Sequence, residues 1–249
     1  MTGQINRVIL LFMADLEIKG MTETSFLDWD GKIVTTLYLP LCNFRCPFCH
    51  NSGLVVNPHE FETIPLDKIE KYLLEHQDFL DGICLTGGEP LLHKGRGLRH
   101  FMRRIKNHGF LIKLDTNGAD PDGLQELIDD KLVDYIAMDL KAPLDQRYDR
   151  LTGTKTELEQ VKRSVQLIMG SGRNYEFRTT VVPGLLDLDD IKHMAEGIAG
   201  AKRFVLQQFV PGNCYDETLR KAQPYPKEKL VEMVEAARHF VPNTSLRGA

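Results

Sequence analysis

Long hydrophobic runs, surplus positive charge and paired cysteines are all missing from this 249-residue sequence. No apolar stretch approaches the roughly eighteen residues of a membrane-spanning helix. The formal net charge of -4 gives no electrostatic reason to expect nucleic acid as a partner. Five cysteines, an odd number, make a poor disulfide framework and favour a reducing, cytoplasmic location. Two of them, Cys84 in an apolar run and Cys214 in a loop, have no thiol nearby in the sequence and are not expected to bind metal.

What remains is the composition of an ordinary globular protein, 42% hydrophobic and 27% charged, with a length that suits one α/β domain. The first twenty residues, MTGQINRVILLFMADLEIKG, contain a short apolar run that is followed by charged Asp15, Glu17 and Lys19. Because this start has no small-residue cleavage site, we expect mature sequence here and not a secretory signal.

Segments typical of strands and of helices alternate along the chain. The strand candidates are rich in β-branched and aromatic residues, and they lie at 33–39, 82–86, 110–116, 133–140, 175–182 and 203–209. Strands that alternate with helices predict a parallel sheet with right-handed crossovers. Since six units are too few for a closed barrel of eight, we expect an α/β fold that forms an open, partial (β/α)6 barrel. A doubly wound sheet is the alternative.

The whole chain, 1–249, is expected to form one domain. Its parts are an N-terminal extension (1–32), the six βα units (33–209) and a C-terminal helical segment (210–249). Three helices should begin at polar residues that can cap a helix N-terminus, which are Asp120 before Pro121, Thr156 paired with Glu159, and Asp187.

Three cysteines lie close together in the segment LCNFRCPFCHN (41–51). Cys42, Cys46 and Cys49 are one ligand short of a closed structural zinc site, whereas a catalytic metal keeps one position open. His50 could supply the fourth ligand of a Cys3His site, but closed sites usually take their ligands from two separated pairs. The spacing therefore favours a metal centre with one position left for another molecule.

The other unusual residues follow the ends of successive predicted strands. They are the stretches TGGEP (86–90), DTNG (115–118) and DLK (139–141), with Arg178 and the pair Gln207-Gln208. Parallel α/β folds build their active sites at the carboxyl ends of strands. Taken singly, each stretch has an ordinary alternative, such as a glycine turn, an asparagine turn or a solvated ion pair. Their common placement predicts a functional site.

The C-x3-C-x2-C spacing, followed by GGEP at 87–90, resembles the radical S-adenosylmethionine (SAM) superfamily. The sequence is more closely similar to the activating enzymes of glycyl-radical proteins, and above all to the activators of anaerobic ribonucleoside-triphosphate reductase. The resemblance extends over most of the chain, from KGMTETSFLDWDGK (19–32) to KRFVLQQFVPG (202–212). The sequence departs from the pattern at Asp30, where a proline is expected.

This resemblance implies a reductive radical reaction. In such families the three cysteines hold three irons of a four-iron, four-sulfur (4Fe-4S) cluster, and the fourth iron binds the amino and carboxylate groups of SAM. The reduced cluster passes one electron to the sulfonium, which yields methionine and a 5′-deoxyadenosyl radical. The cofactors supply the difficult chemistry, and the protein supplies binding, orientation and protection. The implied product is a glycyl radical on a partner enzyme.

The resemblance also assigns residues to SAM. Gly87, Gly88 and Glu89 would contact the SAM ammonium, because glycine permits close backbone approach and the Glu89 carboxylate suits a cation. Three further residues would line the cofactor pocket: Phe48, whose backbone would meet the adenine, Arg178 and Val182.

A second group of residues is assigned to the SAM carboxylate. Lys141 would pair with it directly. Asp115 and Asp139 would repel each other if left unpaired, and the resemblance implies that they share a monovalent cation beside the carboxylate. Thr116 and Asn117 belong to the same pattern.

The sequence has no second cysteine cluster, so the electron must come from another protein, which the resemblance identifies as ferredoxin or flavodoxin. The run HKGRGLRHFMRRIKNHG (93–109) is strongly basic and could receive an acidic donor; the alternative is a solvated helix face. Two other functions stay open. One is radical SAM chemistry on a small molecule, as in 7-carboxy-7-deazaguanine synthase relatives, and the other is a zinc- or cluster-binding module without turnover.

Overall fold

The computed structural model describes residues 16–248. The apolar run near the N-terminus, which we expect to be mature sequence, lies outside this range. Among the described residues, no helix has both the length and the apolar composition needed to cross a membrane.

Eight strands form one sheet, and their order in the sheet is their order in the chain. They are β1 (Gly20–Ser25), β2 (Val34–Leu39), β3 (Gly82–Gly87), β4 (Leu111–Thr116), β5 (Tyr135–Asp139), β6 (Asn174–Val181), β7 (Phe204–Gln208) and β8 (Thr244–Arg247). β1 pairs antiparallel with β2, and each later pair is parallel. Because the sheet runs from β1 at one edge to β8 at the other, the predicted partial barrel is confirmed and is open.

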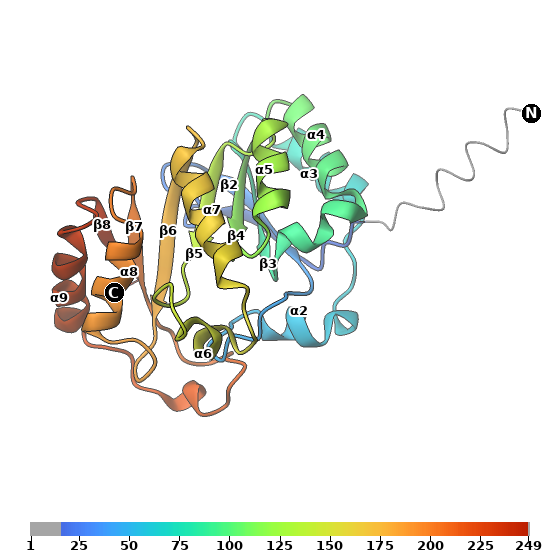
Figure 1. Cartoon of the computed structure of the whole chain (residues 1–249). Coiled ribbons are helices and arrows are strands. Elements are labelled where there is room, and N and C mark those ends of the chain that lie inside the picture. The colour runs from blue at the N-terminus through green and yellow to red at the C-terminus, as the bar shows by residue number, and fades with distance from the viewer. Residues whose placement is uncertain (1–15, 249) are drawn as a thin grey trace, which may run out of the picture.

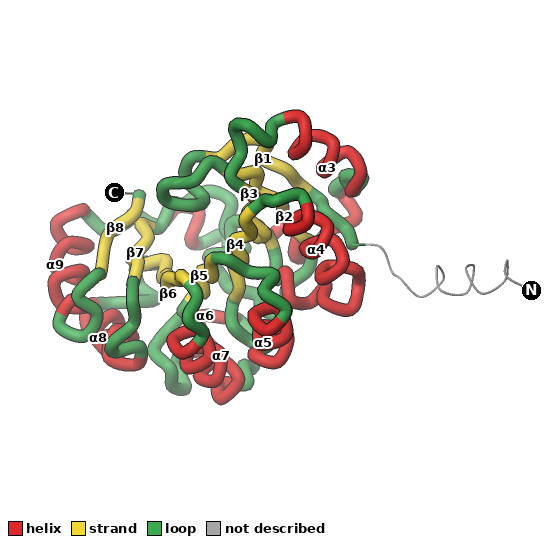
Figure 2. Tube along the Cα trace, turned by 90° about the horizontal axis from the view of Figure 1, so that it is seen from above, coloured by secondary structure: helices red, strands yellow, loops and turns green. Residues whose placement is uncertain are grey.

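Helices connect the strands of this sheet, and the long helices cover one of its faces. The helices are α2 (Ser52–Val56), α3 (Leu66–Glu75), α4 (Arg99–Asn107), α5 (Pro121–Asp129), α6 (Tyr148–Thr152), α7 (Leu158–Gly170), α8 (Leu188–Gly197) and α9 (Lys227–Arg238). Shorter helical turns are η1 (Pro58–Glu60), η2 (Pro90–His93), η3 (Lys94–Leu98) and η4 (Leu219–Lys221). In Figure 2 the strands follow a curve and the long helices lie along its outer side. Figure 1 shows α2 and α6 together at one end of the sheet.

The six predicted strands correspond to β2 through β7, while β1 and β8 were not predicted. β1 lies in the expected N-terminal extension, and β8 lies in the expected C-terminal helical segment. Their sequences, GMTETS and TSLR, are short and contain one large apolar residue each, so neither shows the alternation that marks a half-buried strand. These two segments form strands because they pair with β2 and β7, and not because of their own composition.

Helix starts show both a success and a failure of sequence reasoning. The side chain of Asp187 accepts a hydrogen bond from the backbone N–H of Asp190, and the backbone N–H of Asp187 donates to the Asp190 carboxylate, so the predicted start of α8 is confirmed. Asp120 likewise caps α5. The predicted cap at Thr156 is wrong, because α7 begins at Leu158 and the Thr156 hydroxyl is bonded to that of Thr152 at 2.9 Å. A local side-chain partner displaced the capping bond.

The turn between β1 and β2 is tied to the opposite edge of the sheet. The Asp30 carboxylate forms ion pairs with Arg203, just before β7, and with Arg247 in β8, where the Nη2–Oδ2 distance is 3.4 Å. Arg247 also pairs at 3.0 Å with Glu176, a buried carboxylate of β6. Asp30 is the position that departs from the expected family pattern, and here it links the first strand pair to the last strands.

Candidate active site

A cavity of about 380 Å³ lies at the carboxyl ends of the parallel strands, within the size range of small-molecule sites. All but two of the residues predicted for the cluster and for SAM line this cavity. They come from the loop after β2 and from the ends of β3, β4, β5 and β6. These residues come together because the strands are parallel and in register, with Leu39 beside Gly87 and Asp139 beside Arg178.

The loop that carries the three cysteines is fixed by its own backbone and by α6. The backbone N–H of Arg45 donates to the carbonyl of Thr152 at 2.7 Å, and its guanidinium donates to the carbonyl of Cys42 at 2.6 Å. The Cys42 sulfur accepts from the Phe44 N–H at 3.4 Å and from the Asn117 side chain at 3.7 Å. These contacts hold the loop against the cavity.

The three thiols are free and suit metal ligation. Burial raises the pKa of Cys42 to about 12 and that of Cys46 to about 11. These thiols therefore stay protonated near neutral pH until a positively charged group such as iron binds and stabilises the thiolate. Among residues 16–248, no three cysteine, histidine or acidic side chains converge tightly enough to hold a single ion. A 4Fe-4S cluster takes one thiolate for each of three irons, and the three free cysteines that line the cavity supply that number.

His50 is the candidate fourth ligand of a closed zinc site. Its Nε2 atom is hydrogen-bonded to the carbonyl of Val210 at 2.7 Å, so this nitrogen already has a partner other than a metal. The predicted alternative of a Cys3His site finds no support in this arrangement.

Gly87 and Gly88 bring the end of β3 against the root of the cysteine loop. The Gly88 N–H donates to the Leu39 carbonyl and the Glu89 N–H to the Leu41 carbonyl, both at 2.8 Å. A Cβ on Gly88 would lie 1.8 Å from the Leu41 carbonyl oxygen, and Gly87 has a φ of 108°. The two positions therefore require glycine for contact with the protein's own backbone.

The Glu89 side chain, predicted to contact the SAM ammonium, is buried beside the cavity and holds hydrogen bonds within the protein. Its carboxylate accepts from the Leu91 N–H at 3.1 Å, the Thr116 hydroxyl at 2.9 Å and the Asn117 N–H at 2.7 Å. Burial raises the pKa of Glu89 to about 7, against the effect of these donors. The carboxylate thus connects the β3 loop to the β4 loop. Val182, which was also predicted to line the cofactor pocket, is completely buried in the apolar core.

Charged side chains form a row across the cavity wall. Lys141 contacts Asp139 at 3.2 Å, and Arg178 bridges Asp139 and Asp115 with two bonds of 2.9 Å. Lys113, which is 1% exposed, pairs with the other oxygen of Asp115. Burial alone would raise the pKa of Asp139, but Arg178 and Lys141 outweigh it and hold that pKa well below its usual range.

Lys113 was missed by sequence reasoning. The signal was present, since a lysine stands in the otherwise apolar strand segment FLIKLDT (110–116), two residues before Asp115. A lysine at a strand position that faces the same side as a buried aspartate is expected to pair with it.

Comparison with known proteins gives the family. The sequence pattern of the radical SAM superfamily matches residues 37–198. The chain belongs to the radical SAM superfamily. Enzymes of this superfamily use a 4Fe-4S cluster and SAM, and the free thiols lining the cavity fit that cofactor pair.

Individual relatives agree with this assignment. This radical SAM enzyme is 32% identical over 237 residues to a Methanocaldococcus jannaschii protein provisionally named a glycyl-radical enzyme activating enzyme, with 92% of this chain and 95% of the relative covered. It is 25% identical over 200 residues to the pyruvate formate-lyase-activating enzyme of Clostridium pasteurianum, covering 78% and 81%. The structure of Streptococcus suis SuiB bound to SAM has the same fold, with a TM-score of 0.65 and 14% identity over 86% of this chain and 52% of SuiB.

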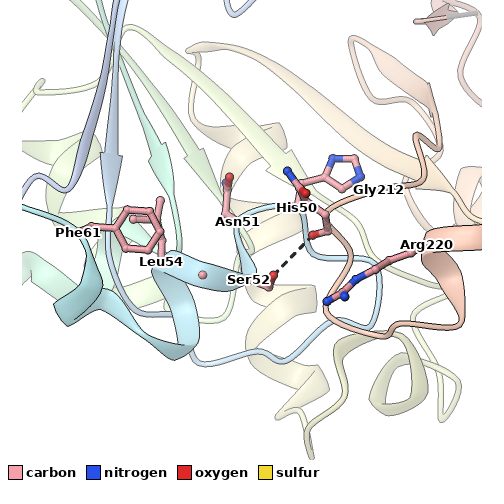
Figure 3. A pocket seen from close by; sticks show the side chains of 9 residues that line it. His50, Asn51, Ser52, Leu54, Phe61, Gly212 and Arg220 are labelled. Atoms are coloured by element: carbon pink, nitrogen blue, oxygen red, sulfur yellow. Dashed lines mark hydrogen bonds between the residues drawn. The ribbon is translucent and has the colours of Figure 1, made fainter.

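A second hollow of about 510 Å³ lies beside the radical SAM cavity (Figure 3). His50 and Asn51 line both spaces, so the segment that directly follows Cys49 separates them. Figure 3 shows Phe61 and Arg220 on opposite sides of the hollow. The Asp216 N–H donates to the Pro47 carbonyl at 2.8 Å, so the chain near Arg220 rests on the cysteine loop.

The basic run at 93–109 is largely neutralised in the folded enzyme. Its side chains form ion pairs with acidic residues of adjacent elements, which are Lys94–Asp120, Arg99–Asp130, Arg99–Glu126, Arg103–Asp130, Arg104–Glu70 and Lys106–Asp134. The run therefore behaves as a helix surface paired with its neighbours. This arrangement favours the alternative interpretation over docking of an acidic donor.

Proposed function

We propose that this enzyme cleaves SAM reductively and generates a glycyl radical on a partner enzyme, an anaerobic ribonucleoside-triphosphate reductase. The full-length similarity to a glycyl-radical enzyme activating enzyme carries this proposal. Cys42, Cys46 and Cys49 would each hold one iron of the cluster, and Lys141 would pair with the SAM carboxylate. When bound, the cluster and SAM supply the electron transfer and the 5′-deoxyadenosyl radical.

The chain's own residues would then orient the reactants. The ammonium of Lys141 lies 5.8 Å from the centre of the Phe48 ring, so the proposed carboxylate and adenine contacts face one space. Further polar side chains line the cavity without a cofactor assignment, among them Asp28, Tyr38, Thr180 and Gln207. Because a peptide backbone offers an N–H and a carbonyl at each residue, these side chains suit an extended, glycine-bearing loop.

The test is direct transfer of a hydrogen atom. Reduced enzyme, SAM and an anaerobic ribonucleotide reductase from the same source should give 5′-deoxyadenosine and a doublet electron paramagnetic resonance signal. The signal should change when the glycine Cα is deuterated, and a reductase with that glycine replaced by alanine should give none. Consumption of a small purine-like substrate, with no radical on the reductase, would assign the enzyme to small-molecule chemistry instead.

We propose further that an external donor, ferredoxin or flavodoxin, docks over the hollow next to the cysteine loop. The five free thiols and such donors fit a cytoplasmic setting. The hollow's wall is the segment after Cys49, which makes it a short route to the cluster. The Arg220 side chain there is 45% exposed, and its acidic partner, Glu217, is an exposed residue at 3.2 Å, so this pair can rearrange on docking. Charged groups at the rim of an interface mainly set the rate of association.

Reversal of that charge is expected to slow electron delivery. Arg220→Glu should lower the rate of cluster reduction by an acidic protein donor by about tenfold, with reduction by dithionite unchanged. Arg103→Glu in the paired basic run is the matched control and should leave both rates unchanged. Stopped-flow absorbance measures both reactions. If Arg103→Glu slows the protein donor and Arg220→Glu does not, docking belongs to the basic run.

A further inference from the structure

The row of charges in the cavity wall alternates in sign along adjacent strands. It runs from Lys113 and Asp115 on β4, through Arg178 on β6 and Asp139 on β5, to Lys141 just beyond β5. Asp139 and Arg178 face each other in the sheet register. Their side chains are partly buried, with 28% of Asp139 and 12% of Arg178 exposed. Water and dissolved salt therefore weaken the attraction between them less than they would at the surface.

Every carboxylate oxygen of the row already has a cationic donor. Asp115 Oδ1 receives Lys113 and Oδ2 receives Arg178, while Asp139 Oδ1 receives Arg178 and Oδ2 receives Lys141. The five groups comprise three cations and two anions, so the row carries one net positive charge. Two neighbouring carboxylates without other partners would need a cation between them. Asp115 and Asp139 have the guanidinium of Arg178 in that position.

We propose that Arg178 is a built-in counter-ion that replaces a dissociable monovalent cation and positions Asp139 and Lys141 for the SAM carboxylate. This proposal depends on one part of the proposed function, which is that SAM binds in this cavity; it does not depend on the identity of the partner enzyme. The planar guanidinium reaches one aspartate through Nε and the other through Nη1. The single ammonium of a lysine does not offer this fork, so lysine is not an equivalent residue here.

The test compares SAM binding in potassium chloride and in choline chloride at equal ionic strength, by calorimetry on anaerobically reconstituted enzyme. The wild-type enzyme should bind SAM equally in both salts. Arg178→Ala should bind SAM about tenfold or more weakly in choline, because the carboxylates are left uncompensated, and potassium should restore most of that loss. Arg178→Lys should remain weak in both salts.

Arg147→Ala is the matched control, because Arg147 also bridges two aspartates, Asp145 and Asp190, at 2.5 and 2.6 Å, outside the cavity. It should bind SAM like the wild type in both salts. A readout without SAM is the melting temperature, which potassium should raise relative to choline for Arg178→Ala only. Potassium-dependent SAM binding by the wild type, or unchanged binding by Arg178→Ala in choline, overturns the proposal. Loss of partner activation with normal SAM binding would instead count against the proposed function.

Discussion

Alanine at any one of Cys42, Cys46 or Cys49 is expected to abolish SAM cleavage. Each thiolate would hold a separate iron, so no neighbour can take over its role. The anaerobically reconstituted wild-type enzyme should contain about four irons and four sulfides per chain, and the three variants should lose most of this content. Iron and sulfide analysis, with chromatography of 5′-deoxyadenosine, measures both effects.

The two other cysteines provide matched controls. Cys84 and Cys214 are both fully buried, and neither lines the cavity. Cys84→Ala and Cys214→Ala should therefore keep the cluster and the activity, at a cost of roughly 1 kcal/mol in stability for the small space each leaves. Tightly bound stoichiometric zinc, with full activity after Cys46→Ala, would show that the chain is a metal-binding module without turnover.

Gly88→Ala should be nearly as damaging, although it removes no ligand. The new Cβ would lie 1.8 Å from the Leu41 carbonyl oxygen, which is backbone and cannot rotate away. The GGEP loop must separate from the cysteine loop, which breaks the 2.8 Å bonds from Gly88 and Glu89. Displacing a reacting group by about 1 Å can cost roughly a hundredfold in rate, so we expect at least that loss in SAM cleavage.

Gly95→Ala distinguishes this clash from a general loss of backbone freedom. A Cβ at Gly95 would have nothing within 4 Å, so the variant should retain full activity. Thermal unfolding of both variants should show a clear loss of stability, roughly 2 kcal/mol or more, for Gly88→Ala alone. Wild-type SAM cleavage by Gly88→Ala would disprove the tight backbone contact.

The sequence was enough to predict where the site lies, but not which partners its side chains would have. β-Branched and aromatic strands with polar residues at their carboxyl ends suffice to bring the motifs after β2 through β5 together, because parallel register aligns those ends. Side-chain direction at a loop is decided by three-dimensional partners. Glu89 shows this, since its carboxylate is taken up by Thr116 and Asn117, which lie far from it in the sequence.

Partners distant in the sequence also explain the missed elements. β8 forms because it pairs with the free edge of β7. Its four residues have little apolar character, so their sequence alone does not predict a strand. Arg178 was predicted only as a cavity residue, because nothing in its own strand reveals that it spans carboxylates on two other strands. Long-range ion pairs of this kind cannot be inferred from local pattern.

The pairing of Asp30 with Arg203 and Arg247 links the two edges of the open barrel through side chains. A fully closed barrel has a circumference fixed by backbone hydrogen bonds, and a bulky guest could enter only by breaking that ladder. Here the gap beyond β8 is bridged by side chains, and Asp30 itself is 49% exposed. Exposed ion pairs are worth about 1 kcal/mol or less each, so such links resist separation of the two edges far less than the hydrogen-bonded ladder of a closed barrel would. The glycine-bearing loop of the proposed partner is a guest that would need such room.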